Sequence, residues 1–176
     1  MIELIQSTNS VLGTLGLFGL VLLPIVFYDY AKTQILARLV ERFGLQFLLG
    51  TTIGGFVLTL VYSEYFGVPP CGLCWFERVF LYPQIVLISI ALYYKDKLLA
   101  PRYGIGLSLI GLIISLYHHY IQMGGSQFVR CPTTGVDCAK RFLFEYNFIT
   151  FPLLSAILFA FLILTYLYIL KSQKTQ

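Results

Sequence analysis

Charged residues are scarce in this chain of 176 residues, which has 12 Lys or Arg and 8 Asp or Glu, 11% in total. Apolar side chains make up 58% of the residues, and the mean hydropathy is +0.81. A soluble domain has about 25% charged residues, because its surface faces water. The bilayer must therefore be the solvent of this chain. The net charge of +4 is scattered rather than gathered into a basic stripe, which argues against nucleic acid as a partner.

Long apolar runs indicate how the chain occupies the membrane. Four windows reach the roughly 20 residues that a spanning helix needs, and they lie at 45–66, 74–94, 103–122 and 148–170. A fifth, shorter window at 11–28 carries Pro24. The runs are continuous, whereas strands of a membrane barrel would alternate apolar and polar residues. We predict an all-α integral membrane protein, a four-helix transmembrane bundle with an additional N-terminal hydrophobic helix.

The predicted bundle divides the chain into three regions. Residues 1–44 hold the extra hydrophobic helix and a connector, 45–170 form the bundle, and 171–176 are a short tail. The first apolar segment lacks the basic start and the cleavage site of a signal peptide, so we expect an uncleaved helix that begins outside the cell. The stretch 31–43 has one apolar helical face, which fits either an interfacial helix on the cytoplasmic surface or a plain helical connector.

The basic residues predict the orientation in the membrane. If every segment spans, eight of the twelve lie on one side: Lys32, Arg38, Arg42, Lys95, Lys97, Arg102, Lys171 and Lys174. The other side holds Arg78, Arg130, Lys140 and Arg141. Since cytoplasmic loops carry the excess of Lys and Arg, the side with eight is expected to be the cytoplasm. All four cysteines then face the extracytoplasmic space, where disulfides persist.

Two of the four cysteines form a CxxC motif where a loop meets an apolar run. Pro69 and Pro70 end the loop, so Cys71 and Cys74 are expected on one side of the first turn of a helix. The unpaired N–H groups of a helix start stabilise a thiolate. Arg78 follows Cys74 by four residues. Its guanidinium could hold an anionic acceptor oxygen or only reach to lipid headgroups, and beside a CxxC motif we favour the first.

The other two cysteines, Cys131 and Cys138, enclose a short loop that contains Pro132 and Gly135. These are turn residues that can bring the ends of the loop together, so a disulfide is sterically plausible. It could pass electrons to the CxxC pair as part of a relay. It could also be a structural staple, which for so small a loop contributes only a few kcal/mol.

Metal and haem sites fit the patterns poorly, and we expect no metal. A four-cysteine zinc site is disfavoured because the CxxC motif lies at a helix start and the second spacing is longer than in a zinc knuckle. Covalent haem attachment needs His after CxxC, where this chain has Trp75. His118 and His119 close the fourth segment, where either could bond a loop, a lipid headgroup or a quinone carbonyl, or relay a proton. Glu77 is expected to pair with its neighbour Arg78.

The run Cys71-Gly-Leu-Cys74-Trp-Phe-Glu-Arg78 at the start of a spanning helix resembles the CxLCxx[QE]R signature of the DsbB family of disulfide-bond formation proteins. The closely spaced second cysteine pair looks like the short-loop, BdbC-type branch of that family. Tyr117-His118-His119 is similar to a Tyr-x-His stretch in the family's third core helix, which makes His119 the matching histidine. The resemblance covers about residues 45–170, and the first 44 residues have no counterpart in the minimal four-helix pattern.

The resemblance implies a membrane thiol oxidase that passes electrons to a quinone, either ubiquinone or menaquinone, and supports protein disulfide bond formation. A reduced thioredoxin-fold partner, DsbA-like or BdbD-like, would attack Cys131. Cys138 would then attack Cys71 and free Cys74 as the thiolate that faces the quinone.

By the same resemblance, Arg78 and His119 would bind the quinone, and the protein would be a multi-pass protein of the bacterial cell (inner) membrane with a cytoplasmic C-terminus. Two other classes are weighed beside this one. A non-enzymatic membrane subunit would use its cysteines as structural staples. A transporter is disfavoured because the spans lack acidic or basic residues at mid-depth.

Overall fold

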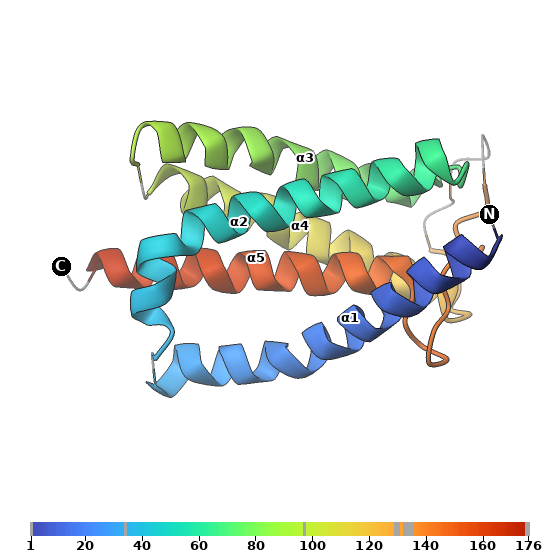
Figure 1. Ribbon diagram of the computed structural model, residues 1–176, viewed down its shortest axis with the longest axis horizontal. Helices are drawn as coiled ribbons and strands as arrows, with labels where there is room; N and C mark the ends of the chain where they lie inside the picture. Colours follow the sequence, from blue (N-terminus) through green and yellow to red (C-terminus); the bar gives the residue numbers. More distant parts are fainter. Residues whose placement is uncertain (1, 34, 97, 129–130, 132–135, 175–176) are drawn as a thin grey trace.

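Five long helices build the protein, and the computed structural model describes residues 2–33, 35–96, 98–128, 131 and 136–174. In chain order they are α1 (Ile2–Tyr28), α2 (Ala37–Leu60), α3 (Gly72–Tyr93), α4 (Leu99–Gln122) and α5 (Phe151–Lys174) (Figure 1). Wide π-helical turns at Asp29–Thr33 and Val61–Tyr65 continue α1 and α2. Each helix is long and apolar enough to cross a membrane. The predicted all-α membrane fold, with its fifth helix, is confirmed.

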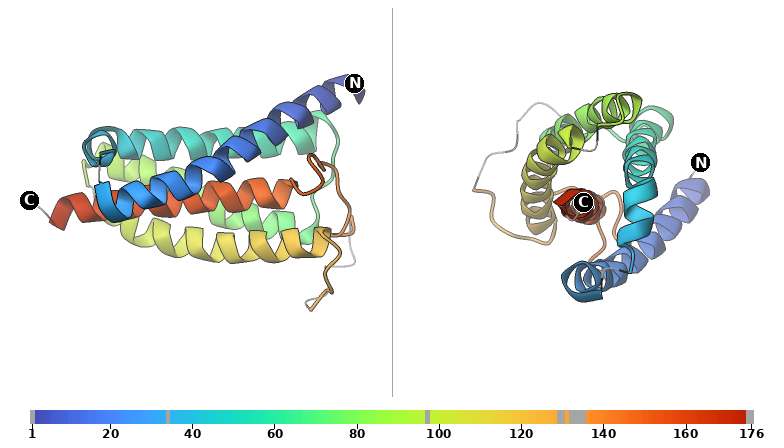
Figure 2. Two further views of the ribbon diagram at one scale, coloured as in Figure 1. Left: turned by 90° about the horizontal axis from the view of Figure 1, so that it is seen from below. Right: turned by 90° about the vertical axis from the view of Figure 1, so that its left-hand side faces the viewer.

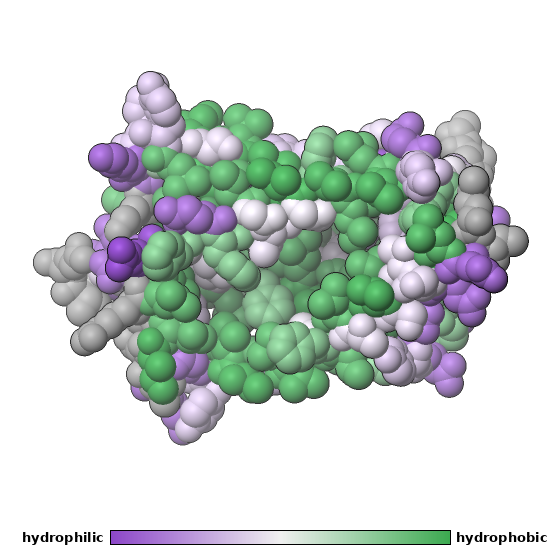
Figure 3. All heavy atoms as spheres, in the orientation of Figure 1, coloured by the Kyte–Doolittle hydropathy of each residue, from purple (hydrophilic) through white to green (hydrophobic). Residues whose placement is uncertain are grey.

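The outer surface of the helices is apolar over the middle of the molecule. Figure 3 shows hydrophobic residues across this band and hydrophilic residues gathered at the two ends. Large side chains such as Phe18, Val86 and Ile113 are about three-fifths exposed on the outside of their helices. An apolar band between polar ends is the surface expected of a protein that sits in lipid.

Helix α5 lies at the centre and the other four helices surround it (Figure 2). In the most apolar stretch of α5, 50% of the residues are buried inside the protein. The corresponding share for α1 is 17%. A helix that is apolar on every side is suited to this position, because it has no face that must meet water. Small residues let α4 approach it closely: a Cβ atom on Gly104 would overlap the ring of Tyr166, and one on Gly111 the ring of Phe159.

A buried polar node joins three helices in the middle of the bundle. The side-chain oxygen of Gln84 on α3 accepts hydrogen bonds from Ser108 Oγ on α4 at 3.1 Å and from Tyr166 OH on α5 at 3.0 Å. All three side chains are fully buried. Since no polar atom of the node is left unpaired in the hydrocarbon core, the node fixes the register of α3, α4 and α5.

Helix α1 is bonded to the bundle at both of its ends. Near the start, Asn9 donates to the carbonyl of Phe142 at 3.1 Å and accepts from Tyr62 OH at 2.7 Å. Near the end, Tyr168 OH donates to Asp29 Oδ2 at 2.6 Å. The Asp29 carboxylate also accepts from the backbone N–H groups of residues 35 and 36, just before α2 begins. The described part of 31–43 contains the end of the π-helical turn, a turn before α2 and the first residues of α2, which cross the end of the bundle before the helix runs along it (Figure 1). The interfacial helix and the plain connector both stay predictions for this stretch.

The two loops that carry the cysteines lie at the same end of the bundle. The connection from α2 to α3 and the one from α4 to α5 are both at the end where the N-terminus lies, and the C-terminus is at the other end (Figure 1). The tight α3–α4 turn and the α1–α2 connection lie at the C-terminal end. This arrangement brings the CxxC motif and the second cysteine pair to one face.

Candidate active site

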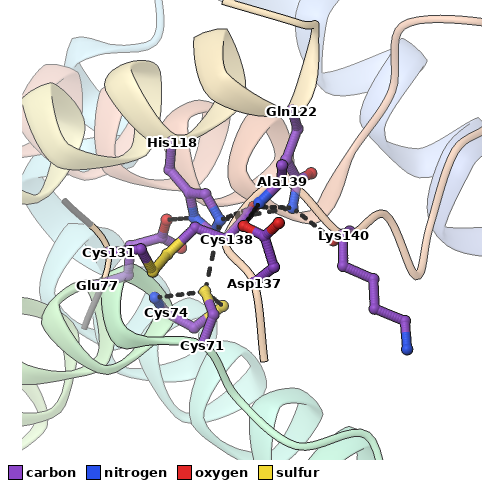
Figure 4. Close-up of a disulfide and its surroundings, with 10 residues drawn as sticks. All are labelled: Cys71, Cys74, Glu77, His118, Gln122, Cys131, Asp137, Cys138, Ala139 and Lys140. Atoms are coloured by element: carbon purple, nitrogen blue, oxygen red, sulfur yellow. Dashed lines mark hydrogen bonds and ion pairs between the residues drawn. A yellow bond between two sulfur atoms is a disulfide. The ribbon is translucent and has the colours of Figure 1, made fainter. Parts of the chain in front are cut away.

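The CxxC pair begins helix α3. Cys71 is the N-cap residue, with extended backbone, and its Sγ accepts a hydrogen bond from the backbone N–H of Cys74 at 3.3 Å. Pro69 and Pro70 keep the preceding residues out of the helix. Both cysteines are free thiols, with their sulfur atoms 2.7 Å apart (Figure 4). The two thiols can therefore form a disulfide by small side-chain rotations, without movement of the helix.

The imidazole of His118 on α4 lies beside this pair. Its Nε2 is 3.5 Å from Cys71 Sγ, and its Nδ1 is 2.8 Å from Glu77 Oε1. The ring is fully buried and Glu77 is nearly so. In the tautomer in which Nδ1 carries the proton, Nδ1–H donates a hydrogen bond to Glu77. Nε2 can then exchange a proton with the thiol. Glu77 thus pairs with His118, whereas the sequence suggested Arg78.

Cys71 has an acidic thiol. Its pKa is lowered to about 4 by a hydrogen bond from the Cys74 thiol and, next, by the hydrogen bond and positive charge of His118. Burial opposes these effects and would by itself raise the pKa. A thiol with so low a pKa is ionised at neutral pH, and a thiolate is the form that attacks disulfides and leaves from them readily.

Arg78 lies one turn further along α3 and points into the bundle. Only 9% of the residue is exposed, and its Nη2 donates to the backbone carbonyl of Thr59 on α2 at 3.0 Å. Its guanidinium carbon is 5.3 Å from the centre of the Trp75 ring. The buried position does not match a side chain that extends to lipid headgroups. A guanidinium has five N–H donors, so this contact leaves several of them for a ligand.

A cavity of about 160 Å³ opens between these groups and α2 and α5. Cys71, Cys74, Arg78 and His118 all line it. Most of the remaining wall is apolar, and it includes Leu58, Leu81, Phe142, Phe151, Leu154, Leu158 and Phe159. Mostly apolar walls with a few polar groups are typical of a site for a small organic ligand.

The second cysteine pair forms a disulfide, Cys131–Cys138, with the Cα atoms 6.2 Å apart. Cys138 is fully buried, whereas Cys131 is half-buried. The carbonyl of Cys138 is 3.3 Å from His118 Nε2 and accepts from Gln122 Nε2 at 3.4 Å (Figure 4). His118 therefore contacts both cysteine pairs, and Gln122 holds the end of the loop against α4. Residues 132–135 of this loop, which include Pro132 and Gly135, lie outside the described residues.

His119, the histidine that the family resemblance selected, faces another part of the bundle. Its Nδ1 is 2.8 Å from Thr150 Oγ1, and it is not one of the described residues that line the cavity. A direct contact between His119 and a quinone stays a prediction. The structure brings His118 to the cysteines instead, together with Glu77 and Gln122, which the sequence reasoning did not select.

The chain is similar in sequence to disulfide bond formation proteins. The family model described as "Disulfide bond formation protein DsbB" matches residues 41–169. "Probable disulfide formation protein C 2" of Bacillus anthracis is 36% identical over 121 residues, 68% of this chain and 86% of that protein. "Disulfide bond formation protein C" of Bacillus subtilis is 31% identical over 119 residues, 67% and 85%. The "SPbeta prophage-derived disulfide bond formation protein B" of Bacillus subtilis is 43% identical over 106 residues, 60% and 71%. No solved structure matches the chain.

Proposed function

Because the chain belongs to the DsbB family of disulfide bond formation proteins, and is a thiol oxidoreductase on that ground, we propose that it reoxidises a thioredoxin-fold dithiol protein and delivers the electrons to a membrane quinone. The partner would be an extracytoplasmic DsbA-like or BdbD-like oxidase. The observation that carries the proposal is the contact of one buried histidine with both cysteine pairs, at the edge of an apolar cavity.

The first exchange takes place at the loop disulfide. A partner thiolate attacks Cys131 Sγ, the bond to Cys138 breaks, and Cys138 leaves as a thiolate. The second thiol of the partner then displaces Cys131, so the partner ends as a disulfide and the loop as a dithiol. The half-buried position of Cys131 and the full burial of Cys138 support this order, because the attacked sulfur must be reachable.

The second exchange moves the electrons to the CxxC pair. With Cys71 and Cys74 joined as a disulfide, the Cys138 thiolate attacks Cys71 Sγ and releases Cys74. Cys131 then attacks Cys138, which restores the loop disulfide and frees Cys71. Cys71 is released as a thiolate, and the adjacent His118, which is paired with Glu77, stabilises that charge.

The cavity fits a quinone ring. Its apolar walls suit the ring and the start of a prenyl tail, and the Arg78 guanidinium would hold an anionic oxygen. A bound quinone supplies the final acceptor, which takes two electrons and two protons. Cys74 would face the ring, and Arg78 would stabilise negative charge there. The cysteine end would face the extracytoplasmic side of the bacterial cell membrane, with the C-terminus in the cytoplasm.

A trapping experiment tests the relay. In Cys138→Ser the loop has no disulfide, so the Cys131 thiolate forms the mixed disulfide by attacking the disulfide of an oxidised partner. No second loop thiol is left to displace the partner, so the mixed disulfide should accumulate on non-reducing gels. Cys131→Ser is the matched control and should trap much less, because its remaining thiol is the buried one. A stronger adduct with Cys131→Ser would show that the partner exchanges with Cys138 first. If neither variant forms an adduct and both still oxidise thiols with quinone, the loop disulfide is only a staple and the relay is wrong.

A further inference from the structure

Three metal-binding atoms meet at the edge of the cavity. The sulfur atoms of Cys71 and Cys74 and a ring nitrogen of His118 all lie within 4.8 Å of one another. Thiolate and imidazole are the ligands that Zn²⁺ prefers, and two cysteines with one histidine make a known type of open zinc site. The sequence patterns disfavour a four-cysteine zinc site. The loop cysteines are joined to each other, so this set of donors is a different one.

The distances suit a tetrahedral ion. With Zn–S near 2.3 Å and Zn–N near 2.0 Å, neighbouring donors are about 3.5–3.8 Å apart. Cys71 Sγ and His118 Nε2 are already at 3.5 Å. The two sulfur atoms, now 2.7 Å apart, would have to separate by about 1 Å, which a rotation of the Cys74 side chain at the helix start can provide.

The groups around the donors also favour a cation. The Glu77 carboxylate accepts a hydrogen bond from Nδ1–H of His118, with 2.8 Å between Nδ1 and Oε1. This bond favours the tautomer whose Nε2 lone pair is left for a metal. Two thiolates balance the charge of the ion. The nearby cations are held elsewhere, since Arg78 is bonded to the carbonyl of Thr59 and the Lys140 side chain extends away from the cluster in Figure 4.

We propose that the reduced CxxC pair and His118 form a Zn²⁺ site that disappears when the pair is oxidised. Both sulfur atoms bind as thiolates, Zn²⁺ + 2 RS⁻ giving Zn(SR)₂, so any proton still on a thiol is released and no electrons are transferred. In the disulfide state neither sulfur is a thiolate, so His118 is the one donor left of the three. The bound ion would hold both thiols and block electron transfer out of the pair, a consequence that rests on the proposed function. The binding itself does not.

The test uses the full chain in detergent with Cys131→Ser and Cys138→Ser, so that the CxxC pair supplies the only thiols. Reduced protein, freed of reductant, competes with a chromogenic chelator for Zn²⁺. We expect one equivalent of Zn²⁺ bound in the reduced state and none after oxidation of the pair. Co²⁺ in place of Zn²⁺ should show thiolate-to-metal charge-transfer absorption. If the double variant does not fold, the same competition is measured on the reduced wild type and on reduced Cys71→Ser. The wild type should bind one more equivalent of Zn²⁺ than Cys71→Ser.

Point variants then identify the ligands. His118→Ala should weaken Zn²⁺ binding at least tenfold, and His118→Gln replaces it if the alanine variant does not fold. Glu77→Gln should weaken binding about tenfold, as is usual for a residue that orients a ligand. His119→Ala is the matched control and should leave the affinity unchanged. Equal Zn²⁺ binding by reduced and oxidised protein, or an affinity that His118 variants do not change, overturns the site. Quinone reduction measured without Zn²⁺ tests the proposed function separately.

Discussion

The His118 ring contacts Cys71 through Nε2 and Glu77 through Nδ1. A change of charge on any one of these three side chains therefore shifts the protonation equilibria of the other two. A buried acid–base chain of this kind keeps the thiol ionised when it is needed as a leaving group. The lowered pKa of Cys71 is the measurable consequence.

Titration of the reduced CxxC pair should therefore show one acidic thiol. The Cys71 thiolate forms as the pH rises through about 4 and is lost as the pH falls through that value. Ultraviolet thiolate absorbance of the reduced Cys131→Ser/Cys138→Ser protein should show this midpoint, well below the ordinary thiol value of about 8.5. His118→Ala removes a hydrogen bond and a positive charge and should move the midpoint upward, whereas His119→Ala should not. A first midpoint near the ordinary value would contradict the assignment.

Arg78 is a buried cation that lines the cavity. Its substitution should weaken quinone binding more than it lowers the stability of the fold. Arg78→Ala removes a charge-assisted hydrogen bond worth about 1.5–3 kcal/mol, which corresponds to about a ten- to hundredfold rise in the KM for quinone. Arg78→Lys keeps the charge and should lose less. Kinetics with a soluble quinone analogue measure the effect. Unchanged kinetics would leave Arg78 with a structural role only, through its bond to Thr59.

At the scale of the elements, helix α4 carries a stripe of small and polar residues that allows close packing. Gly111 lies against the ring of Phe159, whereas Gly106 on the same helix has open space where a Cβ would stand. The two glycines therefore separate the effect of packing from that of helix propensity.

Gly111→Ala should destabilise the protein by about 1–3 kcal/mol, because the added methyl forces the Phe159 ring or α5 to move. Gly106→Ala should be neutral or stabilise by up to about 1 kcal/mol, since alanine favours the helix and meets nothing. Thermal unfolding of both variants in detergent measures the difference. Equal melting temperatures would show that α4 and α5 do not pack this closely.

At the scale of the whole molecule, the polar ends of the bundle differ. The end with the α3–α4 turn and the α1–α2 connection has the larger share of basic residues in sequence, and the other end has the cysteines. We expect the cysteine end outside the cell on this ground.

Cysteine labelling in intact cells tests this orientation. In a cysteine-free background, Ser126→Cys in the exposed α4–α5 loop should react with a membrane-impermeant thiol reagent. Tyr94→Cys, at the exposed end of α3, should react only after the membrane is permeabilised. The reverse pattern would place the cysteine loops in the cytoplasm and remove the basis for an extracytoplasmic partner.

Much of this protein could be predicted from local sequence. The spanning helices follow from the length and continuity of the apolar runs, because a backbone in hydrocarbon must bond to itself. The place of Cys71 and Cys74 at a helix start follows from Pro69 and Pro70. The N-terminal helix was also predicted, although its hydrogen bonds through Asn9 to Tyr62 and the loop before α5 were not.

The partners of Glu77 and the choice between two adjacent histidines depended on the tertiary structure. Neighbours on a helix point about 100° apart, so only the rotation of α4 against α3 decides which histidine meets the cysteines. One signal in the sequence does mark His118, because it continues the buried small and polar stripe of α4, which contains Gly104, Ser108, Gly111, Ser115 and Gln122. The sequence by itself determined that this is a membrane bundle with a redox-type cysteine pair, since length, hydropathy and spacing are local properties. The packing of α3, α4 and α5 decided which side chains surround that pair, because such contacts join residues far apart in the chain.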